Sequence, residues 1–333
     1  MSTTSVIIYR YDSSPFSHKI DNILALKRIP YERVQVSPML PRPEITDLLG
    51  LHYRRIPILA IGNDVYCDTS VITTALERRF PTSQGYGTVF PKAKHGGSTD
   101  TGLIKAFAKS YAETVLFGPA ANLIPWEAIP EAFVKDRSAL IGGALNVHAM
   151  AANRPIAEST ISSHLALLEA QLSDDREWLF ETELPSLADI SVHFVLAWAR
   201  SFPGTQTLFD KNQNPCTIQW LDRLTQFLKT KKDSQGAPST LSGKAAADKI
   251  FASTYESYER VGFDETEASR LGVSAGEMVQ IAPEDTGRGY PTTGKLVALS
   301  REEFILEITS PTGIIRCHFP RIGYFVKPTT AKL

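Results

Sequence analysis

The sequence contains few cysteines, no surplus of charge of either sign and no long apolar run. Its three cysteines, Cys67, Cys216 and Cys317, are widely spaced and include no Cys-x-x-Cys pair, so they predict neither a disulfide framework nor a zinc site. The 35 Lys and Arg residues balance 36 Asp and Glu residues. This balance predicts no general attraction to nucleic acid or to a membrane surface.

The apolar runs are too short and too interrupted to cross a membrane. The sequence begins without a basic region followed by an apolar one, so we expect no secretory signal. Together with the unpaired cysteines, these absences predict a cytoplasmic protein. The length of 333 residues leaves room for two or three folded domains.

Strand-like and helix-like segments alternate in the first eighty residues. Runs of β-branched and aromatic residues predict strands. Pro15 and Pro43 stand where helices begin, and Gly62-Asn63-Asp64 predicts a hairpin turn. The predicted order is β-α-β-α-β-β-α, with strands over 6–11, 31–36, 56–61 and 65–67 and helices over 15–28, 43–49 and 69–80.

The rest of the chain divides into a helical part and a β-rich part. Apolar residues recur at helical spacing between 99 and 232. A polar stretch rich in Gly, Pro and Ser at 229–243 predicts a linker, and a helix over about 244–260 follows. Short β-rich runs after residue 261 predict a small antiparallel barrel or sandwich. The expected helices cover 103–117, 131–150, 158–172, 187–200 and 217–229, and the expected strands cover 278–282, 295–299, 303–308, 314–319 and 324–326.

Ser13, Ser14 and Pro15 stand where the first strand gives way to the first helix. The unpaired N–H groups and the positive dipole end of that helix stabilise an anion, including a thiolate. A serine hydroxyl at this point can donate a hydrogen bond to a bound thiol. Either serine can equally be a simple helix cap.

Two further segments complete the candidate site. If the Ile56-Pro57 bond is cis, the Ile56 backbone can pair with an extended peptide as an added strand does. The alternative is an ordinary strand-edge proline. Asp68 and Thr69 open the helix after the hairpin, where they can hold the ammonium and the carboxylate of an α-amino-acid group, or serve only as an N-cap.

These segments together resemble the glutathione transferase superfamily, most closely its tau, omega and zeta-like branches. The resemblance rests on "SPFSHK" at 14–19, "RRIPIL" at 54–59, "CDTSVI" at 67–72 and "PSLADI" at 185–190. In the last motif Ser186 and Asp189 form a capping box, which is structural. The resemblance implies a thioredoxin-like α/β glutathione-binding domain at 1–82 and an all-helical domain at 98–230. Outside it lie the linker and helix at 231–260 and the small antiparallel β-rich domain at 261–333.

The resemblance implies that Ser14 is the catalytic hydroxyl that stabilises the glutathione thiolate, with Ser13 as the alternative. Because position 14 is not Cys, omega-type thiol transfer is not expected, since a serine forms no mixed disulfide with glutathione.

The other roles also follow from the resemblance. The Ile56-Pro57 backbone would bind the cysteinyl residue of glutathione, and Arg42 the glycyl carboxylate. Asp68 and Thr69 would hold the γ-glutamyl group. Asp68-Thr69 replaces the family's usual Glu-Ser, and Lys19 replaces its usual Arg; neither change removes a required chemical type.

Three aromatic residues, Phe16, Phe107 and Tyr111, are candidates to line the second-substrate pocket, between the loop at 12–16 and the helix at 103–117. Simple core packing is the alternative for each. His148, His164 and His193 lie in different predicted helices with no i, i+4 pair, so we expect no metal site.

The resemblance implies a homodimeric, glutathione-dependent transferase that activates the glutathione thiol for attack on small hydrophobic electrophiles, as in detoxification. One alternative is an isomerase or dehydratase that adds and eliminates glutathione on a small metabolite. The other is a non-catalytic binding scaffold. The β-rich extension can be a lid, a dimer brace or a wall of the substrate site, and the sequence does not choose among them.

Overall fold

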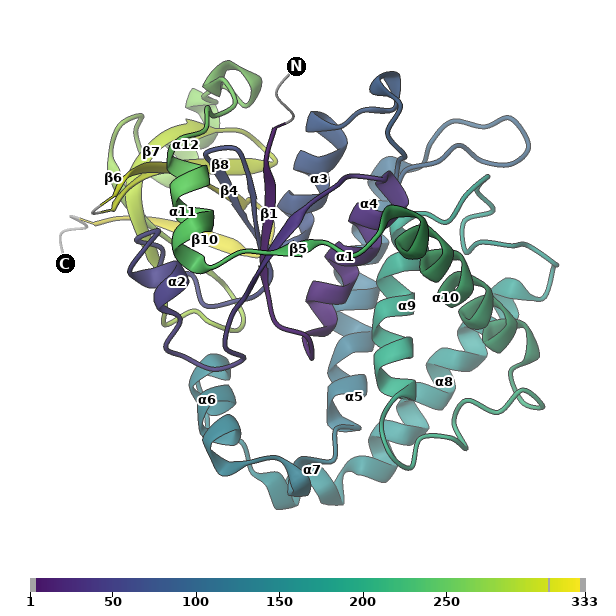
Figure 1. Cartoon of the computed structure of the whole chain (residues 1–333). Helices are drawn as coiled ribbons and strands as arrows, with labels where there is room; N and C mark the ends of the chain where they lie inside the picture. Colours follow the sequence, from purple (N-terminus) through teal and green to yellow (C-terminus); the bar gives the residue numbers. More distant parts are fainter. Residues whose placement is uncertain (1–3, 311, 330–333) are drawn as a thin grey trace.

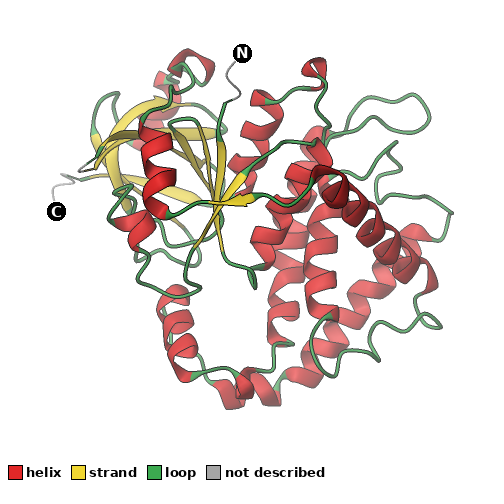
Figure 2. Cartoon of the chain, in the orientation of Figure 1, coloured by secondary structure: helices red, strands yellow, loops and turns green. Residues whose placement is uncertain are grey.

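The computed structural model describes residues 4–310 and 312–329, and it sets a β-sheet beside a group of helices (Figure 1). Figure 2 shows how the strands gather on one side and most helices on the other. The N-terminal unit follows the predicted order β-α-β-α-β-β-α. Its elements are β1 (Val6–Arg10), α1 (Pro15–Lys27), β2 (Glu32–Gln35), α2 (Pro43–Thr46), β3 (Ile58–Ile61), β4 (Asp64–Cys67) and α3 (Thr69–Arg79).

Strand pairing brings three segments of this unit to one edge of the sheet. β1 runs parallel to β2 and antiparallel to β3, with Tyr9 opposite Ile58, and β3 runs antiparallel to β4. The C-terminal ends of β1 and β4 therefore lie beside the N-terminal end of β3. The segments attached to these three ends carry Ser14, Ile56 and Asp68.

Helices dominate the middle of the chain. The helix predicted over 103–117 lies within one helical run made of α4 (Thr101–Ala106), η2 (Phe107–Leu116) and α5 (Phe117–Asn122), and its central ten residues are π-helical. The prediction of a single helix over 131–150 is wrong, because Gly142 takes a left-handed backbone conformation and ends the first helix of this segment. The remaining helices are α6 (Glu131–Ile141), α7 (Val147–Ala152), α8 (Arg154–Leu172), α9 (Leu187–Arg200) and α10 (Pro215–Gln235).

The stretch predicted as a linker over 229–243 is partly helical. α10 continues to Gln235, and the chain then joins the sheet as β5 (Ser239–Thr240), which pairs parallel with β2. In Figure 1 this segment runs as a strap from α10 to α11 (Gly243–Phe251). The helix predicted over 244–260 therefore stops at Phe251, and the linker fastens the helical part to the sheet.

The C-terminal strands continue the N-terminal sheet. They pair antiparallel, as predicted, but β9 also pairs parallel with β4, with Asp64 opposite Arg316. One ten-stranded sheet results, in the order β10-β6-β7-β8-β9-β4-β3-β1-β2-β5. The sequence indicated neither this pairing nor the short helix α12. The elements are α12 (Glu265–Leu271), β6 (Met278–Pro283), β7 (Thr292–Leu299), β8 (Glu303–Ser310), β9 (Gly313–Pro320) and β10 (Tyr324–Pro328).

Apolar side chains cover both faces of the sheet. In β1, Ile8 faces a cluster shared with α1 and α3, and Ile7 faces a cluster shared with the C-terminal strands, as the alternation of a strand requires. A third cluster fills the helical part around Trp220. Among the described residues, no helix is both long enough and apolar enough to span a bilayer.

Candidate active site

Ser14 caps helix α1, and its hydroxyl proton remains available. Its Oγ accepts a hydrogen bond from the Ser17 backbone N–H at 3.2 Å, and the residue is almost fully buried. A hydroxyl that accepts one hydrogen bond can still donate another. Within the described part of the chain, Ser14 Oγ has no other hydrogen-bond partner. The cap is therefore compatible with a hydrogen bond to a bound sulfur.

The two neighbouring serines differ from Ser14. Ser13 lies exposed on the turn before the cap. Ser17, at the third position of α1, is buried, and its hydroxyl finds no partner among the described residues. A buried hydroxyl without a partner costs free energy, so Ser17 offers a second donor at this helix end. No sequence motif marks Ser17, because a serine in the first turn of a helix is common.

The backbone at Ile56 is open for pairing. The Ile56-Pro57 bond is cis, as predicted, and β3 begins only at Ile58. No hydrogen bond to the N–H or C=O of Ile56 is found within residues 4–310 and 312–329. One backbone donor and one acceptor therefore remain at the sheet edge for an added extended segment.

Asp68 is the N-cap of α3, and its φ of 99° is unusual for a residue other than glycine. Its Oδ1 accepts hydrogen bonds from the backbone N–H and the hydroxyl of Ser70 at 2.9 and 2.6 Å. Its Oδ2 lies 3.5 Å from Lys109 Nζ and accepts a hydrogen bond from the Tyr324 hydroxyl at 3.2 Å. Burial raises the pKa of Asp68, but the charge of Lys109, the Ser70 hydrogen bonds and the charge of Arg55 outweigh burial and lower the pKa to about 2.

Thr69 contacts a carboxylate of the protein itself. Its hydroxyl donates to Glu113 Oε1 at 2.8 Å, and Lys19 Nζ reaches the same oxygen at 2.5 Å. The other oxygen of Glu113 lies 3.3 Å from Lys109 Nζ. Burial lowers the pKa of the Lys109 ammonium, but the charges of Asp68 and Glu113 outweigh burial and leave that pKa raised. Helix η2 thus places an ion pair on the two residues predicted to hold the γ-glutamyl group.

Arg42 is engaged by backbone carbonyls. It is buried, and its guanidinium donates to the carbonyls of Ser37, Pro38 and Arg54 at 2.8, 3.1 and 2.5 Å. These bonds tie the loop after β2 to the segment that leads to Ile56. The sequence-based role of Arg42, binding the glycyl carboxylate, would have to share the guanidinium with these three carbonyls.

We expect Arg42→Met to lower the free energy of unfolding by about 2 kcal/mol or more, because leaving a buried polar group without its partner costs about 1–3 kcal/mol. Arg301→Met is the control, since Arg301 has 78% of its side chain exposed, and it should unfold as the wild type does. Urea denaturation followed by circular dichroism measures both. An Arg42→Met protein of unchanged stability that no longer binds glutathione would favour the ligand-binding role instead.

The predicted aromatic pocket residues lie in two separate groups. Phe107 stacks on Tyr111 with ring centroids 4.8 Å apart, and the Tyr111 hydroxyl contacts His164 Nδ1 at 3.2 Å. Phe16 instead packs on Phe117 at 4.8 Å. All three predicted residues are partly buried against the core of the helical part, so packing explains their contacts as they stand.

The C-terminal extension adjoins the candidate site directly. Arg55 donates to the carbonyl of Thr286 at 2.8 Å. The Tyr324 hydroxyl lies 2.8 Å from the Tyr53 hydroxyl and donates to Asp68. Of the roles that the sequence left open for the extension, these contacts fit a wall of the site.

The sequence matches two described protein families. Residues 8–84 match the glutathione S-transferase N-terminal domain, and residues 119–233 match a domain of unknown function (DUF7962). Among curated proteins, prostaglandin E synthase 2 of Danio rerio is 39% identical over 71 residues, which are 21% of this chain and 18% of that protein. This chain therefore matches less than a fifth of that relative.

Solved structures resemble the fold over different lengths of the chain. A GST-like protein from Pseudomonas syringae matches with a TM-score of 0.73 and 26% identity, over 98% of this chain and 100% of that one, so the likeness includes the C-terminal strands. A rice GST in complex with glutathione matches with a TM-score of 0.51 and 18% identity, over 75% of this chain and 96% of that chain, which is a likeness of fold. The chain thus carries a glutathione S-transferase N-terminal domain over residues 8–84, and its thioredoxin-like and helical parts with the β-rich C-terminal extension have a GST-like fold.

Proposed function

We propose that this protein binds glutathione at the sheet edge described above and directs the glutathione thiolate at the electrophilic carbon of a small hydrophobic substrate. The observation that carries the proposal is the convergence of three groups on one edge. The capped N-terminus of α1 offers the Ser14 hydroxyl, and Asp68 with Thr69 offers an acid and a hydroxyl. The Ile56 backbone, whose N–H and C=O have no hydrogen bond within the described residues, offers a strand partner.

Each group has a matching part of glutathione. The cysteinyl N–H and C=O pair with the Ile56 backbone as an added strand. The γ-glutamyl ammonium pairs with Asp68, and its carboxylate accepts a hydrogen bond from Thr69. With the tripeptide so placed, the sulfur lies at the N-terminus of α1, within reach of the Ser14 hydroxyl.

The helix end and the hydroxyl both favour the thiolate over the thiol. Lowering the thiol pKa by about two units requires about 2.7 kcal/mol of preferential stabilisation. A hydrogen bond to a charged group contributes about 1.5–3 kcal/mol, and the dipole end about 0.3–1 kcal/mol. The thiolate then forms the S–C bond with the substrate, and the leaving group departs with the electrons of the bond that breaks.

We expect Ser14→Ala to raise the pKa of the bound glutathione thiol and to slow conjugation at neutral pH while glutathione affinity is nearly kept. The folded state should lose no more than about 1 kcal/mol, the scale of a lost cap. Thiolate absorbance in the ultraviolet, followed against pH in the glutathione complex, measures the thiol pKa.

Ser13→Ala is the matched control, because Ser13 is one residue further from the helix and exposed. A Ser14→Ala titration that overlays the wild type, together with a shifted Ser13→Ala titration, would move the catalytic role to Ser13. Measuring glutathione consumption in the same assays separates the reaction types, since conjugation consumes glutathione and isomerisation does not. A protein that binds glutathione but turns over no electrophile would be the non-catalytic scaffold.

A further inference from the structure

We propose that Lys109 and Glu113 act as an internal competitor for the γ-glutamyl end of glutathione, and that glutathione binds only when segment η2 withdraws them. This inference rests on the proposed function, since it concerns the same site. It assigns to two residues of the helical part a role in setting glutathione affinity.

The charges of this pair reproduce those of the ligand group. A γ-glutamyl group carries one ammonium and one carboxylate on a single carbon. In the structure the ammonium of Lys109 lies 3.5 Å from Asp68 Oδ2, and Thr69 donates a hydrogen bond of 2.8 Å to the carboxylate of Glu113. The two charges lie 3.3 Å from each other. The partners proposed for the ligand are therefore the partners of the protein's own ion pair.

Asp68 and Glu113 already have partners for their charges and hydrogen bonds in the protein itself. Lys19 Nζ adds a second cation at 2.5 Å from Glu113, and the Tyr324 hydroxyl adds a donor to Asp68. The side chains of Asp68 and Glu113 are each only 7% exposed. Two buried carboxylates that are paired and hydrogen-bonded leave no free partner for an incoming zwitterion. Glutathione must therefore break the contacts of Lys109 and Glu113 before it can make its own.

The segment that carries the pair has an unusual backbone. Lys109 and Glu113 lie in η2, whose ten residues are π-helical, between the α-helical segments α4 and α5. π-Helical stretches are rare, mostly a single turn, and frequent at functional sites. Because a π-helix has more residues per turn than an α-helix, conversion of η2 to α-helix would turn its side chains about the axis. The same movement would carry both members of the pair away from Asp68 and Thr69.

The test is calorimetric titration of the full chain with reduced glutathione. The double variant Lys109→Met/Glu113→Gln removes one positive and one negative charge but keeps the aliphatic stem of Lys109 and an acceptor oxygen for Lys19. The matched control is Lys105→Met/Glu302→Gln, which removes an exposed pair, 3.5 Å apart, between α4 and the extension. We expect the double variant to bind glutathione at least tenfold more tightly than the wild type, and the control to bind as the wild type does.

Three results would overturn the inference, and they are distinguishable. If the wild type binds glutathione and the double variant binds it equally or more weakly, Lys109 and Glu113 are not competitors, and the proposed function stands. If neither binds glutathione, the proposed function fails and the inference fails with it. The third result comes from hydrogen exchange of residues 101–122 in the wild type, where saturating glutathione should change the exchange rates of the η2 amides. Unchanged exchange in η2 would contradict its withdrawal even if the double variant misfolds.

Discussion

Replacing Asp189 by Ala should lower the free energy of unfolding by at least about 3 kcal/mol, since each buried donor left without its partner costs about 1–3 kcal/mol. The Asp189 carboxylate is fully buried and accepts hydrogen bonds from the backbone N–H groups of Leu179 and Ser186 at 2.8 and 2.9 Å and from the Trp220 indole at 3.1 Å. It also accepts a hydrogen bond from the Ser186 hydroxyl at 2.7 Å. One side chain thus joins α9, α10 and the loop before α9.

Two further variants serve as comparisons for the loss of stability in Asp189→Ala. Ser186→Ala removes the capping hydroxyl of α9 together with its hydrogen bond to Asp189, but leaves the Leu179, Ser186 backbone and Trp220 donors paired with Asp189, and should cost about 1 kcal/mol. Asp174→Ala removes an exposed acid that pairs with Arg176 on the surface and should leave the unfolding midpoint unchanged. Urea denaturation monitored by circular dichroism measures all three. If Asp189→Ala and Ser186→Ala unfold at the same midpoint, Asp189 contributes no more than the cap, and the links to Leu179 and Trp220 are unimportant.

The same capping box explains why parts of the fold were predictable from the sequence. The helix predicted over 187–200 has the observed bounds of α9, because its start signal lies within four residues and its apolar pattern is strong. The prediction of one helix over 131–150 fails at Gly142-Gly143, because the glycines end the helix although the apolar pattern continues. The pairing of β4 with β9 joins residues about 250 apart, and such a contact leaves no local signal in one sequence.

The candidate site was likewise predictable only in part. Ser14, the cis Ile56-Pro57 bond and the pair Asp68-Thr69 stand next to strand and helix ends, so short motifs marked them. The groups that fill the site come from remote elements: Glu113 lies 44 residues after Thr69, and Tyr324 lies 256 residues after Asp68. A Lys and a Glu four residues apart are common on helix surfaces, so nothing in the sequence marks Lys109 and Glu113 as parts of a site.

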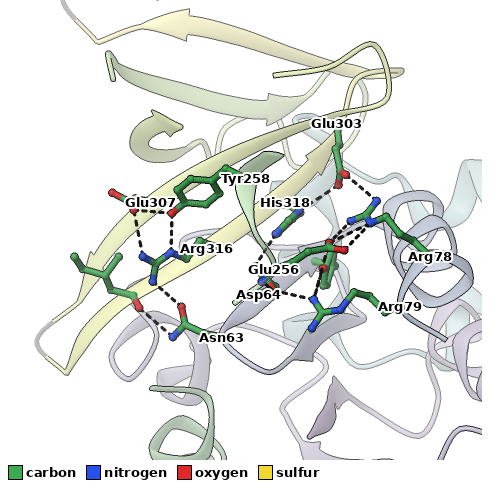
Figure 3. A network of polar contacts seen from close by, with 12 residues as sticks. Asn63, Asp64, Arg78, Arg79, Glu256, Tyr258, Glu303, Glu307, Arg316 and His318 are labelled. Carbon is green, nitrogen blue, oxygen red and sulfur yellow. Dashed lines mark hydrogen bonds and ion pairs between the residues drawn. The ribbon is translucent and has the colours of Figure 1, made fainter. Parts of the chain in front are cut away.

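His318 joins the C-terminal strands to the N-terminal unit inside a buried polar network (Figure 3). Its ring Nδ1 lies 3.2 Å from Glu303 Oε2, and its Nε2 lies 3.2 Å from Asp64 Oδ1. Arg78 pairs with Glu303 at 2.9 Å, and Arg79 pairs with Asp64 at 2.9 Å. The imidazole therefore stands between two carboxylates, one from β8 and one from β4.

The charge count of this network favours a protonated His318. Asp64, Glu303 and Glu256, which pairs with Arg78, carry three negative charges against two arginines, so the charges balance only when the imidazole is positive. Both ring nitrogens face carboxylates, and both can donate only in the imidazolium form. Burial lowers the pKa of His318, but the hydrogen bonds and charges of Asp64 and Glu303 outweigh burial and leave the pKa raised.

At pH 6, His318→Leu should lower the free energy of unfolding by about 3–5 kcal/mol, because it leaves two buried carboxylates short of a cation. The folded-state pKa of His318 lies above the unfolded value of about 6.5. The wild type therefore has the full contribution below pH 6.5 and loses it as the pH rises through the folded-state pKa. The difference in unfolding free energy between the wild type and His318→Leu should therefore shrink as the pH rises, and urea unfolding at a series of pH values measures it.

The control is His148→Leu, because His148 is exposed in α7, and this variant should show no such trend. A difference for His318→Leu that stays constant or grows with pH would mean that the buried imidazole is neutral and that the network closes without its charge.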